Sequence, residues 1–78
     1  MLLAVEPLPN LKQGDTGHSV RVLQALLGLF DSEVFITGVF DHQTRISLMR
    51  FQRLADVKTH EMGKSDAATW TALIAGVT

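Results

Sequence analysis

The chain has 78 residues, of which 46% are hydrophobic and 19% charged, a composition typical of one small folded domain and not of a disordered segment. Seven basic and eight acidic residues give a net charge of −1 without a run of either sign, so the sequence lacks the basic face that binding to nucleic acid or an anionic membrane surface requires. The absence of cysteine excludes disulfides and thiolate chemistry.

Residues 1–10 are predicted to form an extended lead-in to a domain spanning 11–78. Pro7 and Pro9 bias their neighbours away from the helical region. The apolar run at residues 1–5 is too short for a signal peptide or a transmembrane span. We therefore expect either that the domain belongs to a longer exported chain or that it leaves its cell without a conventional signal.

The first predicted helix starts near His18, where a glycine-containing turn gives way to helical spacing, and it closes at residues 31–32. Its apolar stripe consists of Val20, Leu23, Leu27 and Phe30. Residues 34–37 are β-branched or aromatic, but no second run of this kind exists to pair with them. A lone extended stretch or a loop is therefore expected there.

The second and third predicted helices begin in the same way, because Asp41 and Asp66 each precede a threonine by three residues. An aspartate at this position accepts a hydrogen bond from a free backbone N–H of the first turn. The expected apolar stripes are Thr44, Leu48, Phe51 and Ala55 in the second helix, and Trp70, Leu73, Ile74 and Val77 in the third. The sequence thus predicts an all-α fold, a small three-helix bundle-like domain with long loops and two similar N-capped helical units.

Several side chains allow two interpretations. Ile46 and Met49 lie off the second stripe and are expected to be covered by the N-terminal apolar run or the first helix, or else to be exposed. Trp70 is expected in the core with its indole N–H on a polar partner at the edge, whereas an outward-facing ring would stack on a sugar. Gln24 and Gln52 either satisfy the backbone of neighbouring loops or line a binding groove.

The candidates for catalysis or metal binding do not form a site. His18, His42 and His60 are far apart and none shares the i, i+4 spacing that joins two imidazoles on one metal. The stretch HEMGK begins like the zinc-peptidase pattern HExxH, but Lys64 stands in place of the second histidine. No serine sits in a nucleophile elbow. We expect no enzyme activity, no metal and no cofactor.

Three stretches together resemble the peptidoglycan-binding domain found beside bacterial and phage cell-wall hydrolases: GDTGHSVRVLQALL, ITGVFDHQTRISLMRFQ and SDAATWTALIAG. The ordered set covers residues 11–75. The positions that match the family pattern are Gly14, Gly17, Val20, Leu23, Gln24, Gly38, Phe40, Asp41, Thr44, Phe51, Gln52, Thr69, Trp70 and Leu73. Asp41 and Asp66 replace glycines common in the family, and the loop over 56–65 is longer and lacks the usual Asp-Gly turn.

The resemblance implies a non-catalytic three-helix module that holds a linked hydrolase or a virion component on bacterial peptidoglycan, through its glycan or its stem peptide. It further implies a place in the cell envelope or outside the cell, in a protein of bacterial or phage origin. Nucleic acid and membrane are not expected as partners. The alternative is a protein-interaction or assembly module of the same fold without wall binding.

The ligand is expected in a shallow groove at the starts of the second and third helices, where free N–H groups and arginines receive carboxylates. The candidate ligand-binding residues are Arg21, Gln24, Asp41, Thr44, Arg45, Gln52 and Thr69. A plainer interpretation is that the two threonines and Asp41 only cap helices. A helix-turn-helix DNA binder is disfavoured, because Arg45, Arg50 and Arg53 spread around the second helix.

Overall fold

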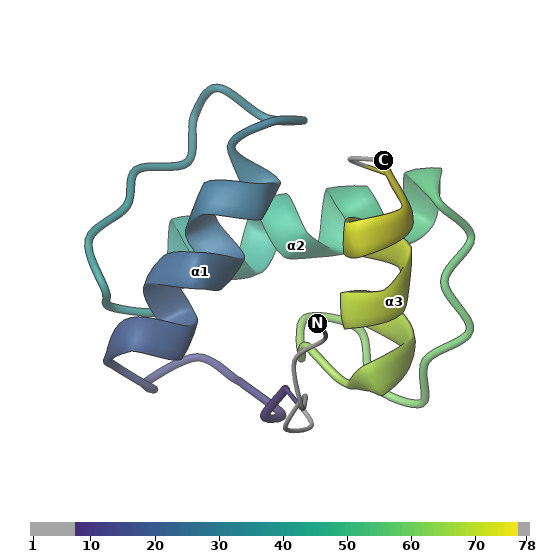
Figure 1. Cartoon of the computed structure of the whole chain (residues 1–78), viewed down its shortest axis with the longest axis horizontal. Helices are drawn as coiled ribbons and strands as arrows, with labels where there is room; N and C mark the ends of the chain where they lie inside the picture. Colours follow the sequence, from purple (N-terminus) through teal and green to yellow (C-terminus); the bar gives the residue numbers. More distant parts are fainter. Residues whose placement is uncertain (1–7, 77–78) are drawn as a thin grey trace, which may run out of the picture.

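The computed structural model describes residues 8–76 and contains three helices, α1 (His18–Leu27), α2 (His42–Leu54) and α3 (Ala67–Gly76). Helices α1 and α3 lie on the same side of α2 and are joined to it by long loops (Figure 1). Two isolated antiparallel bridges, but no strand, occur within the described residues. The predicted all-α three-helix fold is confirmed, and residues 34–37 form a loop.

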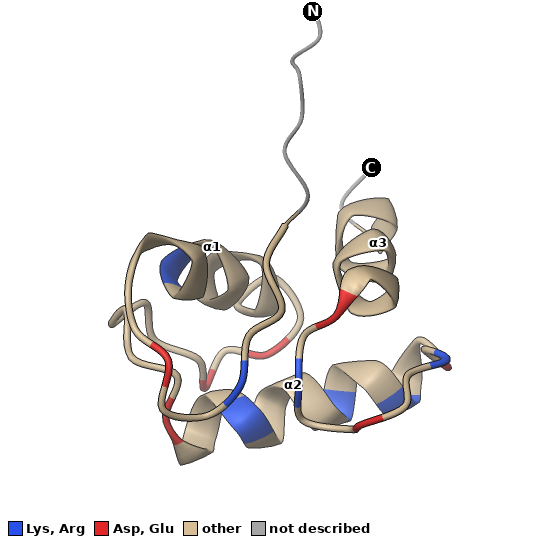
Figure 2. Ribbon diagram, turned by 90° about the horizontal axis from the view of Figure 1, so that it is seen from below, with Lys and Arg blue, Asp and Glu red and all other residues tan. Residues whose placement is uncertain are grey.

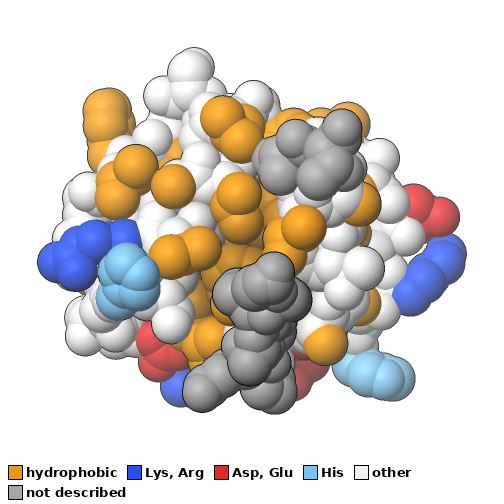
Figure 3. Space-filling view, viewed as in Figure 1, with side chains coloured by type: hydrophobic (Ala, Val, Ile, Leu, Met, Phe, Trp, Pro, Cys, Tyr) orange, Lys and Arg blue, Asp and Glu red, His pale blue; other side chains and the backbone are white. Residues whose placement is uncertain are grey.

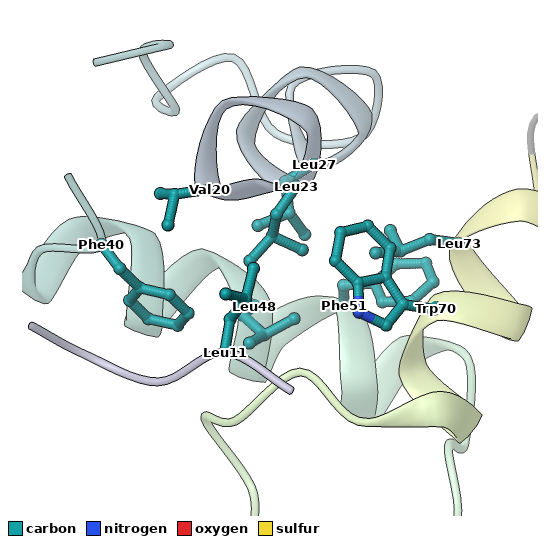
Figure 4. Close-up of a cluster of buried hydrophobic side chains, with 9 residues drawn as sticks. All are labelled: Leu11, Val20, Leu23, Leu27, Phe40, Leu48, Phe51, Trp70 and Leu73. Atoms are coloured by element: carbon teal, nitrogen blue, oxygen red, sulfur yellow. The ribbon is translucent and has the colours of Figure 1, made fainter. Parts of the chain in front are cut away.

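One apolar core lies between the three helices, with its side chains directed toward one another from α1, α2, α3 and two loops (Figure 4). Its members are Leu11, Val20, Leu23, Leu27, Phe40, Leu48, Phe51, Trp70 and Leu73. Trp70 is only 2% exposed, and its indole Nε1 donates to the Pro9 carbonyl oxygen at 2.8 Å. The prediction of a core tryptophan with a polar partner at the edge is confirmed, and this bond ties the N-terminal segment to α3.

The predicted stripes are wrong near the helix ends. Helix α1 stops at Leu27, because the chain after Gly28 turns tightly and the N–H of Phe30 donates to the Leu27 carbonyl at 2.9 Å. Phe30 is therefore 45% exposed and does not belong to the core stripe. Its ring still contacts Phe51, with 5.1 Å between the two ring centroids. Ala55 follows the last residue of α2 and is exposed.

Four apolar residues outside the core differ in how well their predicted burial agrees with the structure. Ile74 is 45% exposed, contrary to the expected third stripe, and Val77 lies outside the described residues. Ile46 and Met49 are half-buried. A β-carbon built on Gly63 would lie 3.5 Å from the Met49 Cγ, so the loop before α3 covers part of Met49. The cover expected from residues 1–5 falls outside the described residues.

The two Asp-initiated helices share one capping geometry. The Asp41 Oδ1 accepts hydrogen bonds from the Thr44 N–H and hydroxyl, each at 2.9 Å. The Asp66 Oδ1 accepts from the Thr69 N–H at 3.0 Å and from its hydroxyl at 2.9 Å. Each cap contributes about 1 kcal/mol to the stability of a small domain. The predicted pair of similarly capped units is confirmed, while α1 begins at Gly17 without a side-chain cap.

These hydrogen bonds favour the charged form of both carboxylates. The Thr44 N–H, followed by the Thr44 hydroxyl, holds the pKa of Asp41 below its usual range. Burial raises the pKa of Asp66, but hydrogen bonds from the Thr59 hydroxyl and from Thr69 outweigh this effect, and the net shift is downward. The Thr59 Oγ1 lies 2.6 Å from the Asp66 Oδ2.

The lowered aspartate pKa values predict loss of stability in acid. Below about pH 4 the unfolded chain binds more protons than the folded chain, so the free energy of unfolding falls as the pH drops toward the folded pKa values. Urea unfolding at about pH 7, 4 and 3 measures the effect. Asp66→Asn keeps a capping oxygen but cannot titrate, so it should lose less stability over this range than the parent. A flat stability profile in the parent, or an equal loss in Asp66→Asn, would contradict the assignment.

Candidate functional site

The side-chain amide of Gln24 joins α1 to the loop that enters α2. Its Oε1 accepts from the backbone N–H groups of Thr37 and Gly38, each at 2.9 Å. Its Nε2 donates to the Val39 carbonyl and to the Thr44 Oγ1, also at 2.9 Å. Because the Thr44 hydroxyl donates onward to Asp41, one chain of hydrogen bonds runs from the loop backbone through Gln24 to the helix cap.

Gln52 repeats this arrangement between α2 and the loop that enters α3. Its Oε1 accepts from the Gly63 N–H at 2.8 Å. Its Nε2 donates to the Lys64 carbonyl at 2.9 Å and to the Thr69 Oγ1 at 3.0 Å. The Thr69 hydroxyl then donates to Asp66. The spacing of glycine, aspartate and threonine is the same in both units, and only the loop before the glycine differs in length.

This repeated network changes the role of four candidate ligand-binding residues. Gln24 and Gln52 are each 1% exposed, Thr44 is 2% exposed and Thr69 is 0% exposed. A wall polymer cannot touch side chains in the interior. The two glutamines satisfy the backbone of neighbouring loops, as the plainer interpretation predicts, and the burial of all four side chains favours a role in positioning these loops over contact with a ligand. Arg21, Asp41 and Arg45 remain nearer the surface.

Arg21 and Arg45 each lie over the glycine of one unit. Gly38 and Gly63 have φ angles of 83° and 84°, a region that L-residues with a side chain rarely adopt. A β-carbon on Gly38 would lie 3.1 Å from the Arg21 Nε, and one on Gly63 would lie 3.0 Å from the Arg45 Nε. The two glycines therefore provide both the backbone conformation and the space in which the arginines pack.

A groove lies where the described residues before α1, which we call the N-terminal segment, meet the loop before α3. Figure 2 shows these two segments running side by side over α2, with residues of both charge signs on them, and Leu11 pairs with Ser65 through bonds of 2.9 and 2.8 Å. One hollow has a volume of about 410 Å³ and an adjoining one about 290 Å³. The first is lined by Asn10, Leu11, Lys12, Thr59, His60, Glu61, Lys64, Ser65 and Asp66. The second is lined by Lys12, Gln13, Arg45, Glu61, Met62, Gly63 and Lys64.

The two hollows share three charged residues, and we call them together the Lys12–Lys64 groove. The Lys12 Nζ lies 3.4 Å from the Asp15 carboxylate, and the Lys64 Nζ lies 2.9 Å from that of Glu61. Arg45 differs, since no carboxylate among residues 8–76 lies within ion-pair distance of it. The groove therefore offers both charge signs and one guanidinium without an anionic partner.

The sequence placed Arg45 at this site but missed the rest of the lining. Of the seven candidate ligand-binding residues, Arg45 is the one that lines the groove, and whether it binds a ligand stays a prediction. Arg21 and Asp41 belong to the other unit and do not line the groove. Lys12 and Lys64 are far apart in the sequence, and the Leu11–Ser65 bridge brings their segments together. The one sequence signal was the polar loop over 56–65, which interrupts the helical pattern.

Ser65 lies in the floor of this groove. Its side chain is fully buried, and its Oγ has no hydrogen-bond partner among the described residues. In the first unit the equivalent position, two residues after the glycine, is held by the buried ring of Phe40. The smaller side chain in the second unit leaves an unsatisfied hydroxyl where the first has an apolar filling.

The described residues contain no group of three or more His, Cys, Asp or Glu side chains placed to hold a metal ion. The longest helix has 13 residues, and none of the helices in the described range could cross a membrane. Comparison of the chain with protein-family models, with curated proteins and with solved structures gave no match. The family resemblance therefore stays an expectation that rests on the quoted residues.

The glutamine network predicts protected amides inside loops. The N–H groups of Gly38 and Gly63 should exchange with solvent as slowly as amides within α2, because both are held by buried amide oxygens. Gln52→Met keeps the length of the side chain but leaves three polar groups without their partner, and should cost at least about 3 kcal/mol. Amide hydrogen exchange followed by NMR measures both effects. Fast exchange at Gly63 in the parent protein would refute the network.

Ser65→Ala is expected to stabilise the domain. Removing a buried hydroxyl that has no partner relieves a desolvation cost of about 1–3 kcal/mol, offset in part by a small void. A gain of 1 kcal/mol raises the melting temperature of a domain of this size by about 4–8 °C. Thermal unfolding followed by circular dichroism is the measurement, with Ser32→Ala as an exposed control. A clear fall in melting temperature for Ser65→Ala would mean that the hydroxyl has a partner.

Proposed function

We propose that the chain is a non-catalytic module that attaches a linked or associated protein to bacterial peptidoglycan, with the Lys12–Lys64 groove as its ligand site. The observation that carries the proposal is an open groove, lined by charged side chains of both signs, on a frame held by buried hydrogen bonds. The arrangement supplies binding groups, and the proposal assigns no bond-making or bond-breaking step to them.

The sequence resemblance supports the proposal through the residues on which it rests. Gln24, Gly38 and Thr44 build the first hydrogen-bonded unit, while Gln52 and Thr69 build the second. The matching positions are therefore those that determine the architecture, which makes an accidental match in ordinary surface residues a poor explanation. A fold by itself does not fix a function, so the groove and its charges carry the functional part.

Weak binding by one small groove is sufficient for the proposed role. Peptidoglycan is a repetitive insoluble polymer, and a tethered module raises the effective concentration of its partner near the wall without a tight individual contact. The partner in this proposal is a cell-wall hydrolase or a virion component, in the same chain or the same assembly. The module would act in the cell envelope or outside the cell, in a protein of bacterial or phage origin.

A protein-interaction or assembly module is the second candidate function. Leu29, Phe30 and Leu54 are exposed, Leu54 by 83%, and the last two line a hollow of about 240 Å³. Apolar side chains also gather between α1 and α3 on the face shown in Figure 3. Exposed apolar surface of this kind is typical of protein contacts. Ile46 and Met49 would favour this function if they were fully exposed, but both are half-buried.

The basic residues of α2 give little support to nucleic-acid binding. Arg50 lies 3.1 Å from the Asp31 carboxylate and 3.2 Å from that of Glu33, and these two contacts raise its pKa. Arg45 packs over Gly63. Only Arg53 is left on this helix as an arginine outside these contacts, which is too little positive charge for a phosphate backbone.

Wall binding is tested by sedimentation of the purified protein with insoluble, protein-free peptidoglycan, with cellulose and chitin as control polymers. We expect retention on peptidoglycan alone. Lys12→Glu should weaken retention, because it reverses a charge in the groove, whereas Lys58→Glu makes the same change in net charge at an exposed site outside the groove and should not.

Circular dichroism of each variant checks that the fold is intact. If folded parent protein stays in the supernatant with walls of every stem-peptide type, the proposal fails. Self-association that rises with concentration would then favour the assembly function at Leu29, Phe30 and Leu54.

A further inference from the structure

We infer that the Lys12–Lys64 groove binds the stem peptide of peptidoglycan and not its glycan chain, with the Arg45 guanidinium pairing with a peptide carboxylate. This inference rests on the proposed function and narrows its ligand to one part of the polymer. Three features of the groove carry it: the charges that line it, the absence of tryptophan, tyrosine and phenylalanine from its lining, and the position of Arg45.

The charges match a peptide better than a sugar. The groove presents Lys12, Lys64 and Arg45 together with Glu61 and Asp66. A glycan of amide-bearing sugars offers hydroxyl and acetamido groups but few ionic ones, whereas a stem peptide carries free carboxylates and commonly an amine. Complementary charges select a partner by excluding ligands that leave them unpaired. A zwitterionic peptide offers a carboxylate to Arg45 and an amine to the exposed Glu61 at the same site.

The groove also lacks a tryptophan, tyrosine or phenylalanine ring on which a sugar could stack, and the imidazole of His60 is the one ring in its lining. Trp70 is buried with its indole N–H on Pro9, and Phe40 and Phe51 belong to the core. Phe30 and Phe35 are exposed, but neither lines either hollow of the groove. Flat aromatic surface at the edge of a site is what an amphipathic ring such as a sugar requires for good apolar contact.

Arg45 is held in a position to receive a carboxylate. Its side chain is half-buried against Gly63, which restricts its rotamers before any ligand arrives. Lys12 and Lys64 already have carboxylate partners at 3.4 and 2.9 Å, but Arg45 has none within the described part of the chain. A planar guanidinium can donate two parallel hydrogen bonds to one carboxylate, which gives geometric selectivity as well as affinity.

Competition between soluble wall fragments tests the inference. Protein bound to insoluble peptidoglycan is challenged with stem peptides free of sugar and, separately, with glycan strands from which an amidase has removed the peptides. We expect the peptides to release the protein and the glycan strands to leave it bound. Release by glycan strands, or failure of peptides to compete while the protein still binds the wall, overturns the inference without touching the proposed function. Absence of any wall binding overturns both.

A matched pair of variants tests whether Arg45 binds the carboxylate of the stem peptide. Arg45→Gln should weaken binding of a stem peptide about tenfold or more in isothermal calorimetry, since one charged hydrogen-bonding group is lost. Arg53→Gln removes the same charge from an exposed site on the same helix, outside the groove, and should leave affinity unchanged. Equal affinity of the folded Arg45→Gln variant and the parent would remove Arg45 from the site.

Discussion

The buried amides of Gln24 and Gln52 are the interaction on which the rest of this domain depends. An all-α chain with long loops must find partners for loop N–H and C=O groups that no helix or sheet satisfies. Each glutamine supplies an acceptor and donors to one loop and passes a hydrogen bond to a capping threonine. An unsatisfied buried group costs about 1–3 kcal/mol, and domains are stable by only about 5–15 kcal/mol in total. Two such amides therefore decide whether so short a chain folds.

The position of the groove depends on the loops that these two glutamines hold. The glutamines hold the ends of two loops, and the N-terminal segment pairs with both of them, through Thr16 with Val39 and through Leu11 with Ser65. Apart from the length of the loop before the glycine, the units differ at one buried position, which Phe40 fills in the first unit and Ser65 occupies in the second. The charged lining of the second unit comes from the N-terminal segment, from the loop that Leu11 joins to it, and from Arg45 of α2. The same structural repeat thus gives one unit with a buried phenylalanine and one unit with a charged groove beside it.

Much of the fold could be predicted from the sequence, since helical spacing and the two Asp caps depend on local physics. The burial of Trp70 also followed from its place on a stripe. The end of α1 could not be predicted in this way, because Phe30 fits the helical spacing and only the turn after Gly28 removes it from the helix. Ile74 fits its stripe equally well, but the core ends before it. Periodicity identifies a face but does not say how far the covering surface extends.

The site was harder to predict, because it depends on pairs that are distant in sequence. Glutamine beside an apolar residue is compatible with a groove wall or with an internal bond, and only the fold distinguishes them. Lys12 and Lys64 become neighbours through the Leu11–Ser65 bridge, which no local pattern indicates. Arg45 was a candidate from the sequence because it lies in the first turn after the Asp41 cap, where free N–H groups and arginines can receive carboxylates.

The most direct test of this account is an NMR titration of isotope-labelled protein with a soluble stem peptide. The account predicts that the largest amide shifts map to Lys12, Arg45 and Glu61 and to the loop through Ser65, while Gly38 and the rest of the first unit stay unchanged. Shifts centred on Leu29 and Leu54, or no shifts at saturating peptide, would contradict it.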